Sequence, residues 1–286
     1  MKEFTFVVSE QFNNYKTCDF LSKQGVSDEI ILKVKFGGVY INGNILKNIN
    51  DKVKGGDLVK MVLPKDKPNP YISPTKAHLK VLFEDEFMLA VVKERGVLTH
   101  SSKYNKGLSL EEMVCGYFLP QEFTFRAINR LDKQTSGIVL IAKDGYTSCL
   151  LNKQMKEGKI LKNYCAIVNG IPEKSHFFIE KPIAREREGS VKRVCREDGK
   201  FAKTECQFIK KIDDEKSLIE VVLHTGRTHQ VRVHLASENL PLYADGLYGE
   251  EVKGKGYILH AKSLQFTHPI TKQEICLYSP LENFDF

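Results

Sequence analysis

The chain has 286 residues, of which 42% are hydrophobic and 28% charged, as is typical of soluble globular proteins with one large domain or two smaller ones. No run approaches the ~20 apolar residues that cross a bilayer, and the N-terminus lacks the apolar core of a signal peptide, so we expect a cytoplasmic protein without membrane association. The net charge of +7 is compatible with a polyanionic partner but does not establish one.

The seven cysteines are odd in number and include no Cys-x-x-Cys pair. This pattern indicates neither a disulfide framework nor a zinc site, so we expect reduced thiols. The sequence also contains no P-loop and no glycine-rich dinucleotide fingerprint. It therefore offers no motif for a metal or a cofactor.

Residues 1–66 are predicted to fold as a small separate unit. A short helix is expected within 19–28, and Ser27 caps a second helix that ends at Gly37-Gly38. A strand follows at 39–43 with an Asn-Gly hairpin turn, and a closing strand lies within 53–63. This order of elements, with GVYINGN and VKGGDLV in those places, resembles the α-L RNA-binding motif. The alternative is a dimerisation or packing module.

Residues 67–78 are predicted to be a linker. Four prolines occur between Pro64 and Pro74, and proline excludes both helix and central strand. The segment is therefore expected to be stiff and extended, which would space the first unit from a second one at 79–286.

The second unit is predicted to contain both strands and helices. Strands are expected at 79–93, 137–142, 161–170, 218–223, 259–266 and 274–278, helices at 108–119, 145–158 and 228–237, and two further strands around the turn at 197–200.

The stretch NRLDKQTSGIVLIAK, residues 129–143, combines reactive side chains with a buried strand. Arg130 and Asp132 lie in a polar turn directly before the apolar run 137–142. A strand buried in the core would hold such an acid firmly, as a reacting group requires. The alternative is a surface turn capped by Asp132 and Thr135.

The segment from Lys181 to Lys211 concentrates positive charge. Its ten Lys and Arg residues face five acids, so it carries +5 of the net +7. Such a stripe is more typical of a phosphate-contacting surface than of a random solvated face.

Residues 224–234, HTGRTHQVRVH, place Gln230 and Arg232 in the first turns of a predicted helix. A helix start favours anions, so a phosphate or the Asp132 carboxylate is a candidate neighbour. The three histidines are five residues apart, on different helix faces, which disfavours a zinc site. Ser136 is not in a G-x-S-x-G elbow, which disfavours a serine triad. What remains is one acid that an arginine keeps ionised, together with Tyr164 and a basic surface.

Residues 79–286 resemble, in order, the RluA-like family of pseudouridine synthases. NRLDKQTSGIVLIAK is similar to the family's HRLD-x-x-TSG segment, KNYCAIVNG to K-x-Y-x-A-x-V-x-G, and LHTGRTHQVRVH to L-x-TGRTHQ-I-RVH. The segments KPIAREREGSVKRVCREDGKFAKT, NLPLYADGLYG and LHAKSLQFTHPITK also match the family. The resemblance implies an α+β fold with a mixed, mainly antiparallel central sheet, flanking helices and a cleft.

The resemblance also implies roles for individual residues. Asp132 would be the catalytic carboxylate, Tyr164 would stack on the target uracil and take part in proton transfer, and Arg232 would pair with Asp132. Arg130 would enter the RNA stack in place of the flipped uridine. The other expected RNA contacts are Arg227, His229, Gln230, Lys143 and Lys162. The implied partner is ribosomal or transfer RNA, with no cofactor, no metal and a monomeric protein.

Two positions depart from the family pattern. Asn129 replaces the histidine before Arg-Leu-Asp, so the local hydrogen bonds must differ. Lys93-Glu-Arg-Gly96 replaces Lys-Pro-x-Gly, and the loss of proline is expected to free that loop.

Two other functions remain open from the sequence. A non-catalytic RNA-binding or ribosome-assembly protein could keep this fold, although the presence of Asp132, Tyr164 and Arg232 together favours an enzyme. A carboxylate-dependent glycoside or nucleoside hydrolase usually needs two acids, and only one stands out here.

Overall fold

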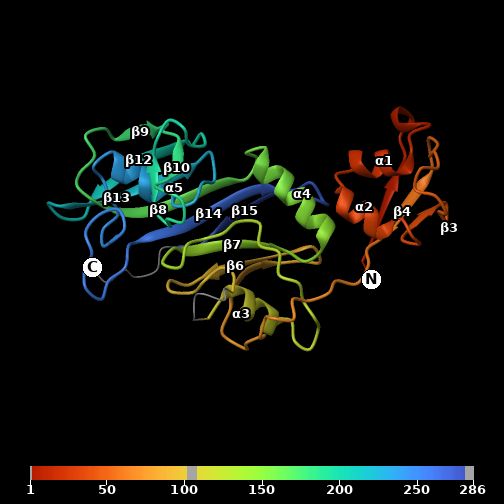
Figure 1. Ribbon diagram of the computed structural model, residues 1–286, viewed down its shortest axis with the longest axis horizontal. Helices are drawn as coiled ribbons and strands as arrows, with labels where there is room; N and C mark the ends of the chain where they lie inside the picture. The colour runs from red at the N-terminus through yellow and green to blue at the C-terminus, as the bar shows by residue number, and fades with distance from the viewer. Residues whose placement is uncertain (1, 102–107, 281–286) are drawn as a thin grey trace.

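The computed structural model describes residues 2–101 and 108–280, which form a small N-terminal unit and a larger unit built on a long sheet (Figure 1). The N-terminal unit has a four-stranded antiparallel sheet in the order β1-β4-β2-β3. Its elements are β1 (Glu3–Val7), the 3-10 helix η1 (Glu10–Phe12), α1 (Thr17–Lys23), α2 (Asp28–Val34), β2 (Val39–Ile41), β3 (Asn44–Ile45) and β4 (Leu58–Val62).

Local signals place most of these elements where the sequence predicts them. The Ser27 hydroxyl accepts a hydrogen bond from the backbone N–H of Ile30 and so caps α2. Asn42 and Gly43 both have positive φ, as an Asn-Gly hairpin turn between β2 and β3 requires. Strand β1 was not predicted, because its partner β4 lies more than 50 residues away in the chain.

The N-terminal unit packs directly against α4 (Gly145–Lys156) of the larger unit (Figure 1). Tyr146 is 5% exposed and belongs to the same apolar cluster as Phe4 and Phe20, with its ring 4.7 Å from that of Phe4. Its hydroxyl donates to the Gln24 carbonyl at 2.8 Å, and Lys2 pairs with Asp144 at 3.0 Å. The expectation that the linker spaces the two units is therefore wrong, although the boundaries at residues 66 and 78 stay a prediction.

The larger unit confirms the predicted mixed, mainly antiparallel sheet. The described residues form nine strands in the order β5-β6-β7-β14-β8-β13-β12-β9, with β15 also paired to β14. Among the strand pairings of the described residues, only that of β7 with β14 is parallel. The strands outside the basic segment are β5 (Lys80–Glu84), β6 (Met88–Lys93), β7 (Ser136–Ala142), β8 (Leu161–Asn169), β13 (Lys216–Leu223), β14 (Leu259–Thr267) and β15 (Glu274–Tyr278).

Three helices flank the sheet: α3 (Leu110–Tyr117), α4 and α5 (Gln230–Ser237). A capping box between Ser109 and Glu112 begins α3, and Asp144 caps α4 through the backbone N–H of Thr147. All seven residues of β7 are buried, and alternate ones contribute to apolar clusters on opposite faces of the sheet. No helix in the described part of the chain is long and apolar enough to span a membrane.

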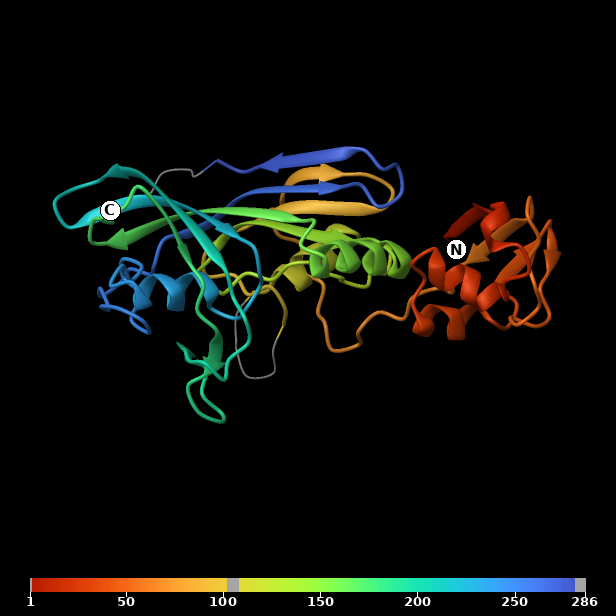
Figure 2. The same ribbon diagram turned by 90° about the horizontal axis from the view of Figure 1, so that it is seen from above.

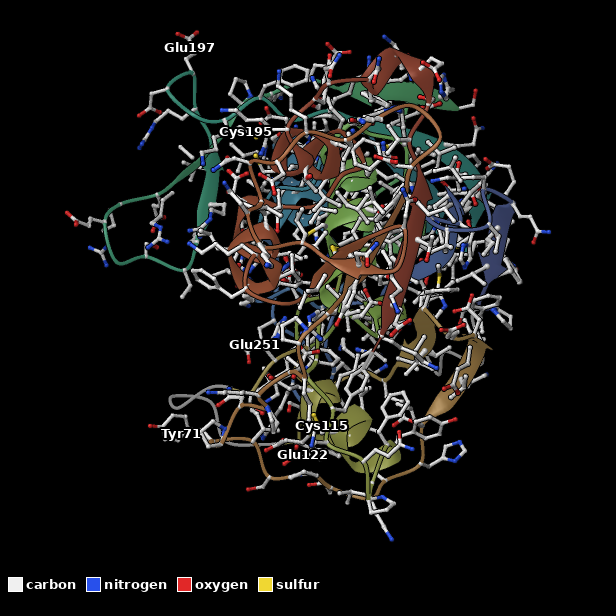
Figure 3. The ribbon with its side chains drawn as sticks, turned by 90° about the vertical axis from the view of Figure 1, so that its right-hand side faces the viewer. Tyr71, Cys115, Glu122, Cys195, Glu197 and Glu251 are labelled. Atoms are coloured by element: carbon white, nitrogen blue, oxygen red, sulfur yellow. The ribbon has the colours of Figure 1, made fainter. Side chains whose placement is uncertain are left out.

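The basic segment differs from its prediction. It contains β9 (His176–Ile179), β10 (Ile183–Arg185), β11 (Arg193–Cys195) and β12 (Thr204–Lys211), so β10 and β11 pair around residues 186–192 and not around 197–200. Residues 197–199 instead form a turn that returns Lys200 to bridge Ile183. We name residues 183–195 the basic arm; it projects from the body of the protein (Figures 2 and 3).

Candidate active site

The turn that carries Asp132 is fixed to the core through its neighbour Leu131. The buried Thr99 hydroxyl donates to the Leu131 carbonyl at 2.7 Å and accepts from the Leu131 N–H at 3.1 Å. The backbone N–H of Thr135 closes the turn on the Asp132 carbonyl at 3.0 Å. Since Leu131 itself is only 7% exposed, the backbone of Asp132 is held while its side chain remains one-third exposed.

Gly137, at the beginning of β7, allows the next strand to reach the site. Its φ is +112°, and a Cβ there would lie 2.3 Å from the Ala261 carbonyl oxygen. Only glycine tolerates both conditions. The close approach brings β14 into parallel register with β7, pairing His260 with Ser136 and Ala261 with Gly137.

Both departures from the family pattern are accommodated by hydrogen bonds. The Asn129 amide donates to the Ile138 carbonyl and accepts from the Leu140 N–H, both at 2.9 Å, so it binds the edge of β7 in two directions. The buried Lys93 ammonium donates to the carbonyls of Glu94, Val97 and Lys133 at 2.9, 2.7 and 3.3 Å. The expectation of a freed loop is therefore wrong, because Lys93 fastens the loop to the Asp132 turn.

Burial of Lys93 has an electrostatic consequence. Burial lowers the pKa of Lys93 from 10.5 to about 8, although the nearby charge of Asp132 acts in the opposite direction. The ammonium is joined to the Asp132 turn by its hydrogen bond to the Lys133 carbonyl.

Arg232 faces Asp132 as predicted, but its main partner is Asp245. Its Nη1 is 3.3 Å from Asp132 Oδ2, whereas Nε and Nη2 donate to the two Asp245 oxygens at 2.7 and 2.8 Å. Burial acts to lower the pKa of Arg232, but the hydrogen bonds to Asp245, together with the electrostatic interactions with Tyr257, Asp245 and Asp132, outweigh it and the pKa is raised. The guanidinium also lies over the rings of Tyr248 and Tyr257, at 4.9 and 4.4 Å from their centres.

His229 approaches Asp132 from the beginning of α5. It adopts a left-handed conformation with φ of 57°, which is uncommon for a residue other than glycine. Its Nε2 lies 3.7 Å from Asp132 Oδ2, and its Nδ1 is 2.9 Å from the Tyr248 hydroxyl. Burial lowers the pKa of His229, against the opposing charge of Asp132.

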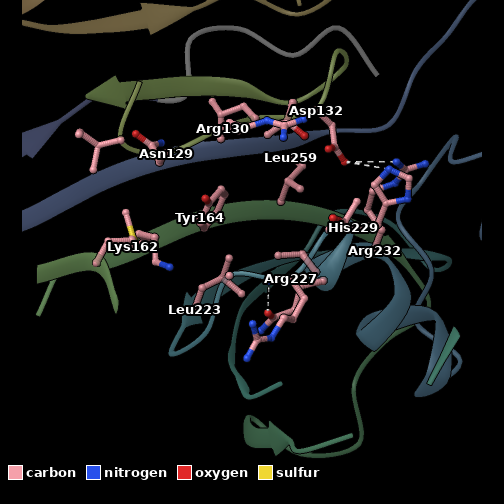
Figure 4. A pocket seen from close by; sticks show the side chains of 18 residues that line it. Asn129, Arg130, Asp132, Lys162, Tyr164, Leu223, Arg227, His229, Arg232 and Leu259 are labelled. Carbon is pink, nitrogen blue, oxygen red and sulfur yellow. Dashed lines mark hydrogen bonds and ion pairs between the residues drawn. The ribbon is translucent and has the colours of Figure 1, made fainter. Parts of the chain in front are cut away.

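Tyr164 and Lys162 come from β8, beneath the Asp132 turn (Figure 4). Tyr164 is 6% exposed, and its burial, reinforced by the charge of Asp132, raises the pKa of its hydroxyl. Burial lowers the pKa of Lys162, whose ammonium is 3.5 Å from the Thr225 carbonyl. Both residues line one cavity of about 330 Å³ together with Asp132, His229 and Arg232, a size suited to a small ligand.

The other predicted RNA contacts fall into three groups. Arg130 and Arg227 are exposed and line the cavity, where Arg227 also donates to the Phe201 carbonyl at 2.9 Å. Gln230 also lines it, but its amide is occupied by the Arg227 N–H, Thr225, Lys203 and Thr204, so it shapes the beginning of α5. The structure does not bring Lys143 to the cavity: it follows the far end of β7 and pairs with Glu84 at 2.6 Å.

Sequence reasoning missed Asp245, Tyr248, Tyr257 and Lys93 as parts of the site. Asp245 and Tyr248 lie in the matched segment NLPLYADGLYG, so the motif was visible but their contacts with Arg232 were not. No group of three metal-ligating side chains occurs within residues 2–101 and 108–280. The described site combines the partly exposed carboxylate of Asp132 with the side chains of Arg232 and Lys93, which are held by hydrogen bonds, and with the buried phenol of Tyr164.

Comparisons with known proteins agree on one family. Residues 88–237, just over half of the chain, match the family described as RNA pseudouridylate synthase. The ribosomal large subunit pseudouridine synthase C of Buchnera aphidicola is 31% identical over 96% of this chain and 93% of its own. YjbO of Bacillus subtilis, described as an uncharacterised RNA pseudouridine synthase, is 29% identical over 92% and 94%. The structure of human RNA pseudouridylate synthase domain containing 1 has a TM-score of 0.59 and 25% identity, over 71% of this chain and 83% of its own.

Proposed function

This chain belongs to the RluA-like family of RNA pseudouridine synthases and is an isomerase, and we propose that it converts specific uridines of ribosomal RNA to pseudouridine with Asp132 as the catalytic carboxylate. Transfer RNA is the second candidate substrate. The proposal depends chiefly on one observation: the Asp132 side chain is one-third exposed at a cavity in which Arg232 lies beside it and Tyr164 below it.

The reaction exchanges one bond of the uridine for another. The bond between C1′ of the ribose and N1 of uracil breaks, the uracil turns, C5 bonds to C1′, and the C5 proton is replaced by a proton at N1. Asp132 can serve either as the nucleophile at C1′ or as the base in a glycal route. In either role the carboxylate acts beside the guanidinium of Arg232, whose Nη1 lies 3.3 Å from Asp132 Oδ2.

The neighbouring residues have separate tasks in this proposal. The target uridine leaves the RNA stack to reach the cavity, which costs a few kcal/mol by general estimates for base flipping. The exposed Arg130 fills the vacated position in the stack. Tyr164 stacks against the uracil, and because its pKa is raised its hydroxyl keeps its proton and can donate a hydrogen bond.

The basic arm and the N-terminal unit supply the wider RNA contact. The segment containing the arm carries the excess of positive charge, suited to phosphates. The N-terminal unit offers an exposed cation and ring: Phe36 is 84% exposed, and the Lys35 ammonium lies 4.7 Å from the centre of its ring. We assign residues 1–66 to RNA binding, and the contact with α4 gives this unit a fixed place relative to the cavity.

Large-subunit ribosomal RNA is favoured over transfer RNA by the 31% identical Buchnera relative that bears that assignment in its name. The test is a pseudouridine map of both RNA classes from cells that lack the gene, complemented with the wild-type protein or with Asp132→Asn. The proposal expects marks in ribosomal RNA that vanish in the deletion and return only with the wild-type protein. Loss of marks in transfer RNA alone would overturn the substrate, and restoration by Asp132→Asn would overturn the role of Asp132.

A further inference from the structure

Tyr248 connects three parts of the protein that are distant in sequence. Its hydroxyl accepts a hydrogen bond from the backbone N–H of Arg193, in the basic arm, at 2.8 Å. The same hydroxyl lies 2.9 Å from Nδ1 of His229, and its ring lies against the guanidinium of Arg232. Tyr248 thus contacts the arm and two neighbours of Asp132, the imidazole of His229 and the guanidinium of Arg232.

The hydrogen-bond pattern fixes which atom donates. The Arg193 N–H can only donate, so it occupies an acceptor position on the phenol oxygen. The hydroxyl hydrogen then points to His229 Nδ1, because in the reverse arrangement it would have no protein acceptor among the described residues that contact this hydroxyl. With Nδ1 accepting, the proton of a neutral imidazole is on Nε2.

The contact of the other imidazole nitrogen of His229, Nε2, favours the same tautomer. Nε2 of His229 lies 3.7 Å from Asp132 Oδ2. An N–H at this position is attracted to the carboxylate, whereas a lone pair would be repelled by it. The lowered pKa of His229 agrees with a neutral ring.

We propose that Tyr248 is a positioning residue that holds His229 in the Nε2–H tautomer, so that His229 presents an N–H donor to the Asp132 carboxylate. The basic arm takes part, because the Arg193 N–H orients the Tyr248 hydroxyl. The link to catalysis rests on the proposed role of Asp132, whereas the tautomer itself does not.

The test combines a spectroscopic and a kinetic measurement on the full chain. Long-range ¹H–¹⁵N correlation spectra distinguish the two histidine tautomers, and His229→Gln identifies the signals of His229. Wild type is expected to show the Nε2–H form at neutral pH, and Tyr248→Phe is expected to show Nδ1–H signals. The matched control is Tyr257→Phe. Tyr257 is the second ring that packs against Arg232, but its hydroxyl is hydrogen-bonded to Thr135 and not to His229. This variant should leave the His229 tautomer unchanged.

Kinetics then separate positioning from folding. Tyr248→Phe keeps the ring against Arg232, and we expect its single-turnover rate to fall about tenfold with the RNA Kd unchanged. A wild-type Nδ1–H tautomer, an unchanged tautomer in Tyr248→Phe, or a changed tautomer with a wild-type rate would each overturn the proposal. If Tyr248→Phe does not fold, the wild-type tautomer alone decides. An active Asp132→Asn variant would refute the proposed role of Asp132 and leave the tautomer result valid.

Discussion

Arg232 donates two hydrogen bonds to Asp245, at 2.7 and 2.8 Å, and one of 3.3 Å to Asp132. The side chain of Asp245 is 1% exposed and that of Asp132 33%. The buried carboxylate therefore anchors the guanidinium in a bidentate pair, and the exposed carboxylate meets its remaining edge. This division leaves Asp132 both in contact with a cation and accessible.

Replacement of Asp245 should reduce both rate and stability. Asp245→Asn preserves volume, but an amide cannot accept both Arg232 donors and leaves the buried cation with only the 3.3 Å contact to the partly exposed Asp132, at a cost of about 3 kcal/mol or more. We expect the single-turnover rate to fall about ten- to a hundredfold, while the RNA Kd stays within about threefold. Asp213→Asn, which removes an exposed ion pair with Lys216, is the control and should change neither quantity. A wild-type rate in Asp245→Asn would contradict the anchoring role.

The lowered pKa of Lys93 predicts that the stability of the protein depends on pH in a specific way. Its folded pKa of about 8 lies below the usual 10.5, so between these values the unfolded chain binds more protons and the free energy of unfolding rises with pH. The rise should reach about 3 kcal/mol, from 1.36 kcal/mol per pKa unit. Urea unfolding of wild type and Lys93→Met from pH 7.5 to 10.5 measures this rise. The contributions of the other titrating groups cancel when the unfolding free energies of the two proteins are subtracted. If the difference in unfolding free energy between wild type and Lys93→Met does not change with pH, the lowered pKa of Lys93 is refuted.

Two glycines with positive φ should respond differently to alanine. A Cβ at Gly137 would meet the Ala261 carbonyl oxygen at 2.3 Å, whereas a Cβ at Gly158 would have nothing within 4 Å. Gly158→Ala should cost about 1 kcal/mol of unfolding free energy, from backbone strain alone. Gly137→Ala should cost more than about 3 kcal/mol, because β14 must move away from β7. Equal losses in denaturant titrations would show that the close approach of the strands is not needed.

Much of the fold was predictable because its signals are local. The apolar run of β7, the Ser27 cap and the Asn42-Gly43 turn each depend on neighbours in sequence. Strand β1 depends on a partner more than 50 residues away and was missed. The packing of Tyr146 against the N-terminal unit was missed for the same reason. The turn of the basic arm was misplaced although β10 and β11 are close in the sequence.

The residues of the site that lie in recognisable sequence motifs were predictable. Asp132, Tyr164 and Arg232 do line one cavity. The hydrogen bonds from Arg232 to Asp245 and the contact of the Tyr248 hydroxyl with His229 were not predictable. The spacing of residues in the segment that contains Asp245 and Tyr248 does not indicate that they contact Arg232 or His229. The resemblance implied that Lys143 contacts RNA, but the seven residues of β7 separate Lys143 from the Asp132 turn, roughly 20 Å at 3.3 Å per residue.

Tyr164 should affect proton movement more than binding. Tyr164→Phe keeps the ring for stacking and removes the hydroxyl, so we expect an RNA Kd within about threefold of wild type and a rate lower by about 10²–10⁴-fold. Because burial raises the pKa of this hydroxyl, it keeps its proton across the working range. The wild-type rate should therefore show no tyrosine ionisation below pH 10. A pH transition below 10 that disappears in Tyr164→Phe would contradict this.

The central claim is that the Asp132 carboxylate is the group that performs the isomerisation. The most direct measurement follows tritium released from C5 of labelled uridines in ribosomal RNA under single-turnover conditions, together with RNA binding, for wild type and Asp132→Asn. The account predicts that Asp132→Asn binds RNA with the wild-type Kd and releases no tritium above background. Release at a rate within about tenfold of wild type, a difference of only about 1.4 kcal/mol in the barrier, would contradict it.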